Sequence, residues 1–250
     1  MSRGKIVAIH SYRGGTGKSN VTANLAFSAA SAGKRVAVLD TDIQSPGAHV
    51  LFGFKKENIQ ITLIDFLFQR CSIHETAYDL KTRFPECAGF WLVPASMKPT
   101  DITRVIDEGY DLERLNDHIN ELIEHLELDY LLVDTHPGLN RETLLATALS
   151  DVLVLILRPD QQDYYGTAVL TEVASRLEIP ETFMVLNKVL TQMNREQLKE
   201  KVERRFGLDV IGMIPLSEDM AGLGSRDLFS RVYPNHEITH VLRGVLERWA

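Results

Sequence analysis

The chain has 250 residues, of which 44% are hydrophobic and 24% are charged, and its formal net charge is −7. This composition is ordinary for a globular domain with a full core, and the lack of any run of about eighteen apolar residues excludes a membrane-spanning helix. The N-terminal apolar run is too short for a secretory signal, so we expect a cytoplasmic protein.

Seven short apolar runs recur along the chain and predict β-strands. The runs do not alternate with polar residues, and unbroken runs rich in β-branched residues are typical of strands that are covered on both faces. A parallel sheet between two layers of helices has such strands. The runs span residues 6–9, 36–39, 90–93, 130–133, 152–157, 183–186 and 210–214.

Helical patterns fill the segments between the predicted strands. Residues 20–32 are rich in alanine and end before Gly33, a residue type that commonly terminates a helix. Residues 111–127 and 236–249 each carry an apolar stripe at helical spacing, and we expect the second of these to pack on the sheet. Strands that alternate with helices predict an α/β fold: a doubly wound, mostly parallel sheet flanked by helices, as one domain over residues 1–250.

Polar residues follow four of the predicted strands. The run SYRGGTGKSN, residues 11–20, follows the first strand, and Asp40 and Asp42 follow the second. Asp134 and Asn187 follow two later strands. Ligands of such folds bind beyond the carboxyl ends of the strands, so we expect the four segments to form one site at the same edge of the sheet.

The run at residues 11–20 has the features of a phosphate-binding loop. Gly14, Gly15 and Gly17 allow the backbone to turn its N–H groups toward an anion, and the helix that follows adds the positive end of its dipole. Lys18 can reach the β- and γ-phosphates of a nucleotide, and the Ser19 hydroxyl can bind Mg²⁺. The alternative is an ordinary glycine-rich turn between a strand and a helix.

The same run departs from the usual pattern G-x-x-x-x-G-K-[ST], because Tyr12 takes the place of the first glycine and Arg13 follows it. Residues 13–19, RGGTGKS, resemble the deviant Walker A motif K-G-G-x-G-K-[ST] of the ParA/MinD-type ATPases. The resemblance covers essentially the whole chain. Five further segments resemble motifs of that family in the family's order: VAVLDTD (36–42), LVPAS (92–96), LLVDTHPG (131–138), LNK (186–188) and IGMIP (211–215).

The resemblance implies a role for each of these positions. In that family two subunits enclose two nucleotides, and the first lysine of the motif reaches across to the other subunit's phosphates. Arg13 occupies that position and is expected to act as a cross-subunit catalytic cation; the alternative is that it pairs with a carboxylate such as Asp42 or Asp134, or stays solvated. Lys18 and Asp42 complete the implied catalytic set, with Asp42 orienting the attacking water. The implied nucleotide ligands are Gly14, Gly15, Thr16, Gly17, Lys18, Ser19, Asn20, Asn187 and Pro215, and the implied Mg²⁺ ligands are Ser19, Asp42 and Asp134.

Two residues beside the implied site have more than one interpretation. Asp40 is expected either to contact Mg²⁺-bound water or to cap the turn after its strand. His136 departs from the family pattern, in which proline or another small residue is common at this position. We expect a packed or solvated histidine, and the alternative is a residue that senses the γ-phosphate.

The resemblance implies slow ATP hydrolysis that serves as a switch, in which Mg²⁺ and ATP favour a homodimer and hydrolysis releases it. Members of the family position cargo such as DNA, division machinery or organelles, together with a stimulating or cargo-adaptor protein. The last helix is expected to pack on the core, so we predict no membrane anchor. The basic residues within 194–205 make nonspecific DNA a further expected partner, although a solvated helix fits them equally well.

Other classes of protein share the loop and are weighed against this interpretation. A biosynthetic enzyme that uses ATP on a small molecule, and a nucleotide-binding adaptor with little hydrolysis, remain alternatives. An iron–sulfur reductase would need cysteines at cluster spacing, which Cys71 and Cys87 lack. A bacterial tyrosine kinase usually has a tyrosine-rich tail, whereas Tyr233 is the only tyrosine after Tyr165.

Overall fold

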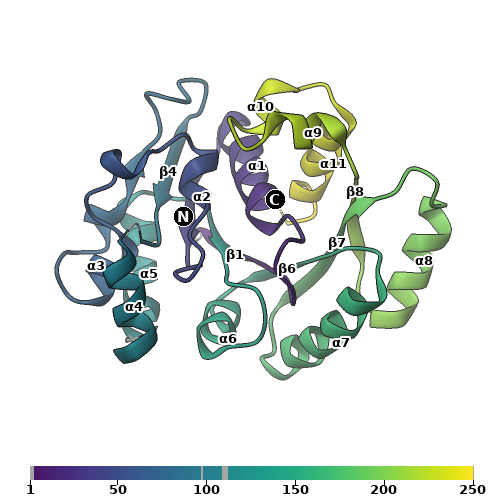
Figure 1. Cartoon of the computed structure of the whole chain (residues 1–250), viewed down its shortest axis with the longest axis horizontal. Coiled ribbons are helices and arrows are strands. Elements are labelled where there is room, and N and C mark those ends of the chain that lie inside the picture. Colours follow the sequence, from purple (N-terminus) through teal and green to yellow (C-terminus); the bar gives the residue numbers. More distant parts are fainter. Residues whose placement is uncertain (1–2, 97, 109–111, 250) are drawn as a thin grey trace.

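The structure is a computed structural model that describes residues 3–96, 98–108 and 112–249. Strands and helices alternate along most of this range, as the sequence predicts (Figure 1). The strands are β1 (Lys5–His10), β2 (Arg35–Asp40), β3 (Tyr78–Asp79), β4 (Gly89–Val93), β5 (Tyr130–Asp134), β6 (Val152–Leu157), β7 (Glu181–Val189) and β8 (Val210–Pro215). The helices are α1 (Lys18–Ser31), α2 (Ala48–Leu51), α3 (Leu63–Leu67), α4 (Pro99–Glu108), α5 (Leu112–His125), α6 (Arg141–Ala148), α7 (Gln161–Arg176), α8 (Arg195–Phe206), α9 (Glu218–Leu223), α10 (Phe229–Val232) and α11 (Glu237–Leu246), with the 3-10 turns η1 (Lys56–Asn58) and η2 (His74–Thr76).

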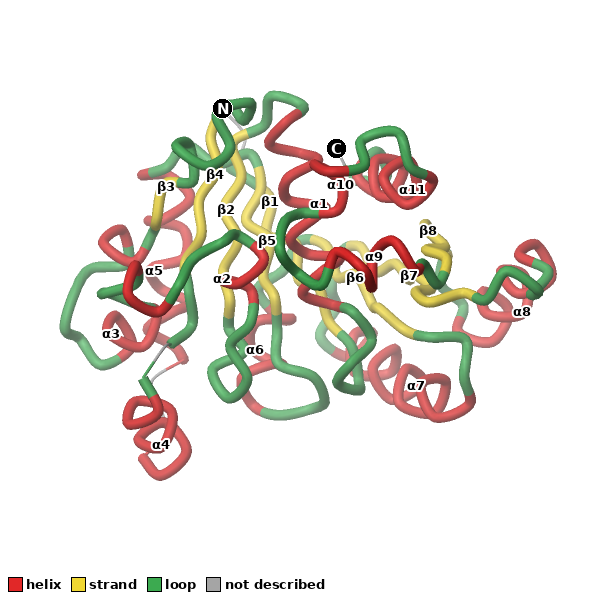
Figure 2. The backbone as a smooth tube through the Cα atoms, turned by 45° about the horizontal axis from the view of Figure 1, so that its top comes forward, coloured by secondary structure: helices red, strands yellow, loops and turns green. Residues whose placement is uncertain are grey.

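The described strands form one eight-stranded sheet with the order β3-β4-β2-β5-β1-β6-β7-β8 (Figure 2). All neighbouring pairs from β4 to β8 are parallel, and β1 lies at the centre between β5 and β6. The seven predicted strands and the mostly parallel sheet are therefore confirmed. The sequence did not predict β3, an antiparallel neighbour of β4, because its two residues are too few to form an apolar run.

Helices cover both faces of the sheet, which explains why its strands carry unbroken apolar runs. Along β1, Val7 and Ile9 belong to the core beneath α1, α10 and α11, whereas Ile6 and Ala8 face the opposite side. On that side α3 and α5 pack beside β2 and β5, and α7 and α8 pack beside β6 and β7. Figures 1 and 2 show α1 and α11 on one side of the sheet and α7 on the other.

The structure contains all three helices that the sequence predicts, and two of them begin or end at a local signal. Helix α1 ends shortly before Gly33, which adopts a left-handed φ of 92°. Helix α5 is described from Leu112 onward, and Asp111, the predicted first residue of this helix, lies outside the described residues. Helix α11 begins after His236, whose ring accepts the Ile238 N–H, and it packs on α1 and β8 as predicted. Within the described ranges no helix is both long enough and apolar enough to cross a bilayer.

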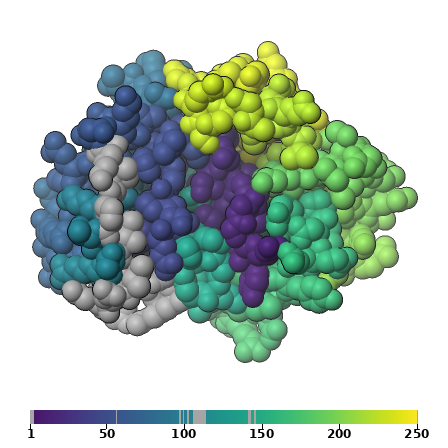
Figure 3. Space-filling model, in the orientation of Figure 1, coloured from purple at the N-terminus to yellow at the C-terminus, as the bar shows by residue number. Residues whose placement is uncertain are grey.

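The carboxyl ends of β1, β2 and β5 lie side by side because these three strands are neighbours in the sheet. Asp134 at the end of β5 is in register with Ile9 of β1 and with Asp40 of β2. In Figure 3 the purple N-terminal part of the chain runs through the middle of the visible face, between the blue part that follows β2 and the green part of the chain. The fold therefore brings the predicted site segments after β1, β2 and β5 to one edge of the sheet.

Candidate functional site

Residues 11–17, between β1 and α1, form a tight turn that we call the glycine loop. Gly15 and Gly17 have φ values of 77° and 94°, in the left-handed region that favours glycine. A Cβ atom on Gly17 would lie 2.4 Å from Nδ2 of Asn187, so this position excludes a side chain on two grounds. The loop and the first turn of α1 line a hollow of about 360 Å³, together with Asp42, Ser45 and Pro137, which we call the phosphate hollow.

A buried ion pair lies beneath the glycine loop. Nζ of Lys18, the first residue of α1, is 2.6 Å from Oδ1 of Asp134, and the two side chains are only 6% and 1% exposed. The Thr22 hydroxyl donates to the Lys18 carbonyl oxygen at 3.0 Å and lies 3.4 Å from the same Asp134 oxygen. Removing either charge would leave the other buried without its partner, which typically costs about 3–5 kcal/mol.

Asp40 is completely buried beside this ion pair. Its Oδ1 accepts the Asp42 N–H at 3.0 Å, and its Oδ2 accepts the Ala48 N–H at 3.3 Å. Burial and, next, the charge of Asp134 raise the pKa of Asp40 to about 8. The two contacts make Asp40 the cap of the turn after β2, which is one of its two expected roles. Its contact with Mg²⁺-bound water stays a prediction.

Asp42 joins two loops of the site. Its Oδ1 accepts the Ser45 N–H at 3.0 Å from its own loop, and Nδ1 of His136 lies 2.7 Å from the same oxygen. His136 belongs to the loop after β5, so the sequence-based expectation of a merely packed or solvated histidine missed this contact. The sequence contained one signal for this contact: a histidine stands at position 136, where the ParA/MinD-type family commonly has proline or another small residue.

Arg13 is paired with the start of α7. Its Nη1 donates to Oε1 of Gln162 and lies 3.7 Å from Oδ1 of Asp163, which is buried. The alternative that Arg13 pairs with Asp42 or Asp134 named the wrong carboxylates, because the fold places the first turn of α7 next to the glycine loop. The Arg13 side chain is still 40% exposed, so part of it faces solvent. Its cross-subunit role stays a prediction.

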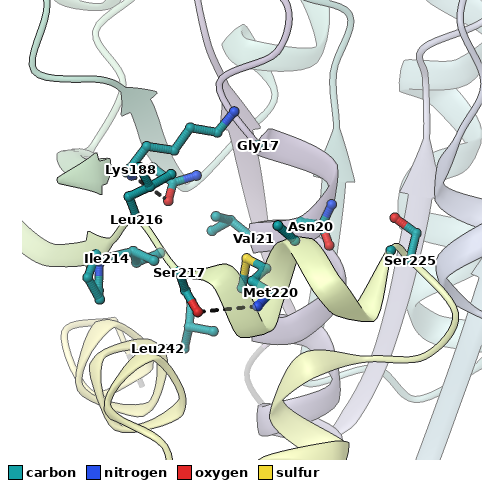
Figure 4. Close-up of a pocket in the computed structure, with 14 residues that line it drawn as sticks. Gly17, Asn20, Val21, Lys188, Ile214, Leu216, Ser217, Met220, Ser225 and Leu242 are labelled. Atoms are coloured by element: carbon teal, nitrogen blue, oxygen red, sulfur yellow. Dashed lines mark hydrogen bonds between the residues drawn. The ribbon is translucent and has the colours of Figure 1, made fainter. Parts of the chain in front are cut away.

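A second pocket of about 360 Å³ lies between α1, the end of β7 and the segment after β8 (Figure 4). Two of its lining residues, Gly17 and Asn20, also line the phosphate hollow, so the two hollows adjoin. The predicted residues Asn187 and Pro215 line it as well. The sequence analysis missed the lining residues that follow the IGMIP segment without a recognisable motif, among them Leu216, Ser217 and Met220.

Two consecutive residues of β7 hold the glycine loop from the side of this pocket. Nδ2 of Asn187 donates to the Thr16 carbonyl oxygen at 2.7 Å, and its Oδ1 accepts the Lys188 N–H at 2.8 Å. One amide N–H and one lone pair of Asn187 remain for a ligand. Lys188, which has a left-handed φ of 58°, donates from Nζ to the Gly15 carbonyl oxygen at 2.8 Å. The sequence gave no role to Lys188 beyond its place next to Asn187.

The groups of this site fit a nucleotide with Mg²⁺. The Thr16 hydroxyl is buried and has no hydrogen-bond partner among the described residues, and the N–H groups of the glycine loop suit an anion. The Ser19 hydroxyl and the carboxylates of Asp42 and Asp134 are oxygen ligands of the kind that Mg²⁺ prefers. In the part of the chain that the structure describes, no three His, Cys, Asp or Glu side chains are arranged to hold a metal alone, so phosphate oxygens and water are the ligands that would complete the shell of Mg²⁺.

A parallel sheet, a glycine loop after its central strand and a buried lysine at the start of the next helix define a P-loop NTPase fold of the α/β class. A model of the AAA domain family matches residues 4–195 of the chain. The chain belongs to this family and is of the ParA/MinD type.

Individual relatives agree with this assignment. An uncharacterized ATP-binding protein of Methanocaldococcus jannaschii is 30% identical over 209 residues, which cover 84% of this chain and 73% of the relative. The chromosome partitioning protein ParA of Myxococcus xanthus is 29% identical over 177 residues, or 70% of this chain and 59% of ParA. Among solved structures, the septum site-determining protein MinD of Pyrococcus horikoshii, complexed with Mg-ADP, has a TM-score of 0.80 at 20% identity over 98% of this chain and 95% of MinD, which shows a shared fold.

Proposed function

We propose that the chain is a Mg-ATP-dependent, dimerising ATPase switch of the ParA/MinD type, built as one domain over residues 1–250, which hydrolyses ATP slowly and positions or partitions an intracellular cargo. The observation that carries this proposal is the buried Lys18–Asp134 ion pair beneath a glycine loop in which Gly15 and Gly17 adopt left-handed φ values. The family membership and the ATP-binding relative support the choice of nucleotide.

The two adjoining hollows fit the two ends of ATP. The phosphates would lie against the N–H groups of residues 14–19, and the base would enter the pocket lined by Asn187 and Pro215. Lys18 would turn from Asp134 to the β- and γ-phosphates, an exchange of one anion for another that keeps its ammonium paired. Mg²⁺, held by Ser19, Asp134 and phosphate oxygens with Asp42 nearby, would neutralise charge on the phosphates.

Asp42 is the group that orients the attacking water in this proposal. Its carboxylate lines the phosphate hollow, where it can accept a hydrogen bond or a proton from water. Help of this kind is typically worth about 10²–10⁴-fold in rate. A slow basal rate suits a switch, because the ATP-bound state then lasts until a stimulating partner protein ends it.

Arg13 acts in the ATP-bound homodimer in this proposal. Arg13 lines the phosphate hollow, and the partners that the described residues give its side chain are Gln162 and the already paired Asp163. Release of these two contacts would free a planar cation that suits phosphate oxygens of a second subunit. The sequence-derived partners therefore remain a second copy of the chain and a stimulating or cargo-adaptor protein.

Helix α8 supports nonspecific DNA as a further partner. Lys201, Arg204 and Arg205 lie together around a shallow hollow on its surface, with Glu200 beside them. Cations without base-reading geometry bind the DNA backbone, and such binding weakens steeply with salt. DNA binding that is independent of salt, or that is unchanged in Lys201→Glu with Arg204→Glu, would contradict this part of the proposal.

Calorimetry on the purified chain tests nucleotide binding. We expect heat from MgATP with the wild type and none with Lys18→Met, because the substitution removes the phosphate-binding cation. Lys34→Met is the matched control, since Lys34 is half-exposed and lies beyond the end of α1. The proposal is overturned if the wild type and Lys18→Met give the same trace.

ATP turnover measured alone, with duplex DNA, with liposomes and with small carboxylates separates the classes of function. Stimulation by DNA supports a positioning ATPase that binds DNA. Stimulation by liposomes would instead support a positioning ATPase that binds membranes. Stimulation by a small carboxylate would contradict the switch and support a biosynthetic enzyme, and binding without any turnover would leave a nucleotide-dependent adaptor.

A further inference from the structure

His136 and Asp42 form a bond between two loops that the motifs of the chain do not explain. His136 follows β5, Asp42 follows β2, and Nδ1 of the histidine is 2.7 Å from Oδ1 of the carboxylate. An ionised carboxylate can only accept, so Nδ1 carries the hydrogen and donates it. The two side chains are largely shielded from water, which strengthens a hydrogen bond to a charged acceptor.

The position of the bond restricts Asp42. Both hydrogen bonds that the described residues give to its side chain, from Ser45 N–H at 3.0 Å and from His136, end on Oδ1. Because the two donors come from separate loops, they hold the position of the carboxylate and also limit its rotation about the bond to Cβ. Oδ2 is then the oxygen left to accept a hydrogen bond from water at the phosphate hollow, which Asp42 lines.

Two other polar side chains around this corner have partners of their own. Lys18 is paired with Asp134, and Nδ1 of His10 lies 2.7 Å from the Thr135 hydroxyl. Burial and, next, the charge of Lys18 lower the pKa of His10 to about 3, so this ring stays neutral. His136 is therefore the side chain that sets the orientation of Asp42.

We propose that His136 is a positioning residue for ATP hydrolysis, which acts by holding the Asp42 carboxylate through its Nδ1–H and thereby ties the loop after β2 to the loop after β5. The inference rests on the proposed function, because it assigns a role to His136 within the same hydrolytic site. Loss of the bond leaves nucleotide binding intact, since His136 lines neither hollow, and slows the chemical step. A misplacement of about 1 Å at a reacting group can cost about 10²-fold in rate.

Two amides of different length provide the test. In His136→Asn the side-chain NH₂ is attached at the same branch point as Nδ1, so it can donate to Asp42, whereas in His136→Gln it sits one bond further out, where Nε2 was. We expect kcat to fall about tenfold to hundredfold in His136→Gln and His136→Leu and to return to within about threefold of the wild type in His136→Asn. The Kd for MgADP is expected to stay within about twofold in all three variants.

The contrary results are equally definite. Equal turnover in the Asn and Gln variants, or a loss of MgADP affinity that matches the loss of kcat, would overturn the positioning role. Should His136→Leu fail to fold, the Asn and Gln variants decide alone, with their melting temperatures as the check on folding. A wild-type chain that neither binds nor hydrolyses MgATP would instead overturn the proposed function.

A double-mutant cycle shows whether His136 acts through Asp42. In the Asp42→Ala background, His136→Gln is expected to cause no further loss of kcat, because the carboxylate that it positions is gone. A further loss as large as in the wild-type background would show that His136 acts independently of Asp42, and the proposal would be wrong.

Discussion

Lys18 and Asp134 lie 2.6 Å apart at the base of the glycine loop, although 116 residues separate them in the sequence. The pair fills the space below the loop with one positive and one negative charge, both almost entirely removed from water. In the proposed nucleotide complex, a phosphate that takes Lys18 leaves Asp134 without its counter-charge, and Mg²⁺ is the cation expected to replace it. In the proposed complex we therefore expect the binding of phosphate and the binding of Mg²⁺ to depend on each other.

Removal of one member of this pair is expected to destabilise the chain strongly. Asp134→Asn leaves the Lys18 ammonium buried without its counter-charge, so the free energy of unfolding should fall by about 3–5 kcal/mol. Urea denaturation followed by circular dichroism measures the change. Arg176→Met, which breaks an exposed ion pair with Glu172 on α7, is the control and should change the stability by less than about 1 kcal/mol. Equal changes in the free energy of unfolding would show that the buried pair contributes no more to stability than an exposed pair.

The same substitution at two glycines is expected to have opposite effects. Gly17→Ala forces an L-residue into a φ of 94° and brings its Cβ to 2.4 Å from Asn187, so it should lower stability by about 1–3 kcal/mol and abolish MgATP binding. Gly244→Ala, inside α11, meets no atom within 4 Å and should raise stability by about 0.5–1 kcal/mol. Thermal unfolding and calorimetry measure both. A stabilised Gly17→Ala chain that binds MgATP would contradict the close packing of the loop.

The sequence predicted the strands of the sheet and the segments that meet at its edge, and there is a physical reason for this. Strands buried on both faces need unbroken apolar runs, and the carboxyl ends of neighbouring parallel strands must meet, so the residues after β1, β2 and β5 could be placed together. The edge strand β3 is too short for any pattern. The partners of the site's side chains were not predictable, because they depend on how α7 and the loops cross the sheet edge. Arg13 with Asp163, and His136 with Asp42, are both of this kind.

Binding of Mg²⁺ with a nucleotide is expected to release a proton near neutral pH. Burial and the charge of Asp134 raise the pKa of Asp40 to about 8, so we expect a substantial fraction of its carboxyl group to carry a proton at pH 7. A divalent cation that replaces the single charge of Lys18 beside Asp134 favours the ionised form of Asp40, and the affinity for MgADP should therefore rise between pH 6 and pH 8.

Calorimetry in two buffers of different ionisation enthalpy counts this proton. The wild type should release a substantial fraction of one proton at pH 7, and Asp40→Asn should release markedly less. Nucleotide without Mg²⁺ serves as the control, because it brings no divalent cation to the carboxylates. Proton release of the same size in Asp40→Asn would assign the proton to another group.

Asp163 is expected to make stability depend on acid pH. Burial alone would raise its pKa, but hydrogen bonds from Arg158, with Nη2 at 2.9 Å and Nε at 3.0 Å, outweigh burial and lower the pKa below its usual value. A carboxyl with a lowered pKa in the folded state stabilises the fold above its unfolded pKa, and this stabilisation is lost as the pH falls through the folded pKa. The wild type should thus be clearly more stable than Asp163→Asn at pH 7, and the difference should shrink below about pH 4, the unfolded pKa.

Urea denaturation at pH 7, 4 and 3 measures this difference in stability. Asp209→Asn, which breaks an exposed pair with Arg248, is the control. A difference that stays constant from pH 7 to pH 3 would mean that Asp163 contributes through packing rather than through its charge.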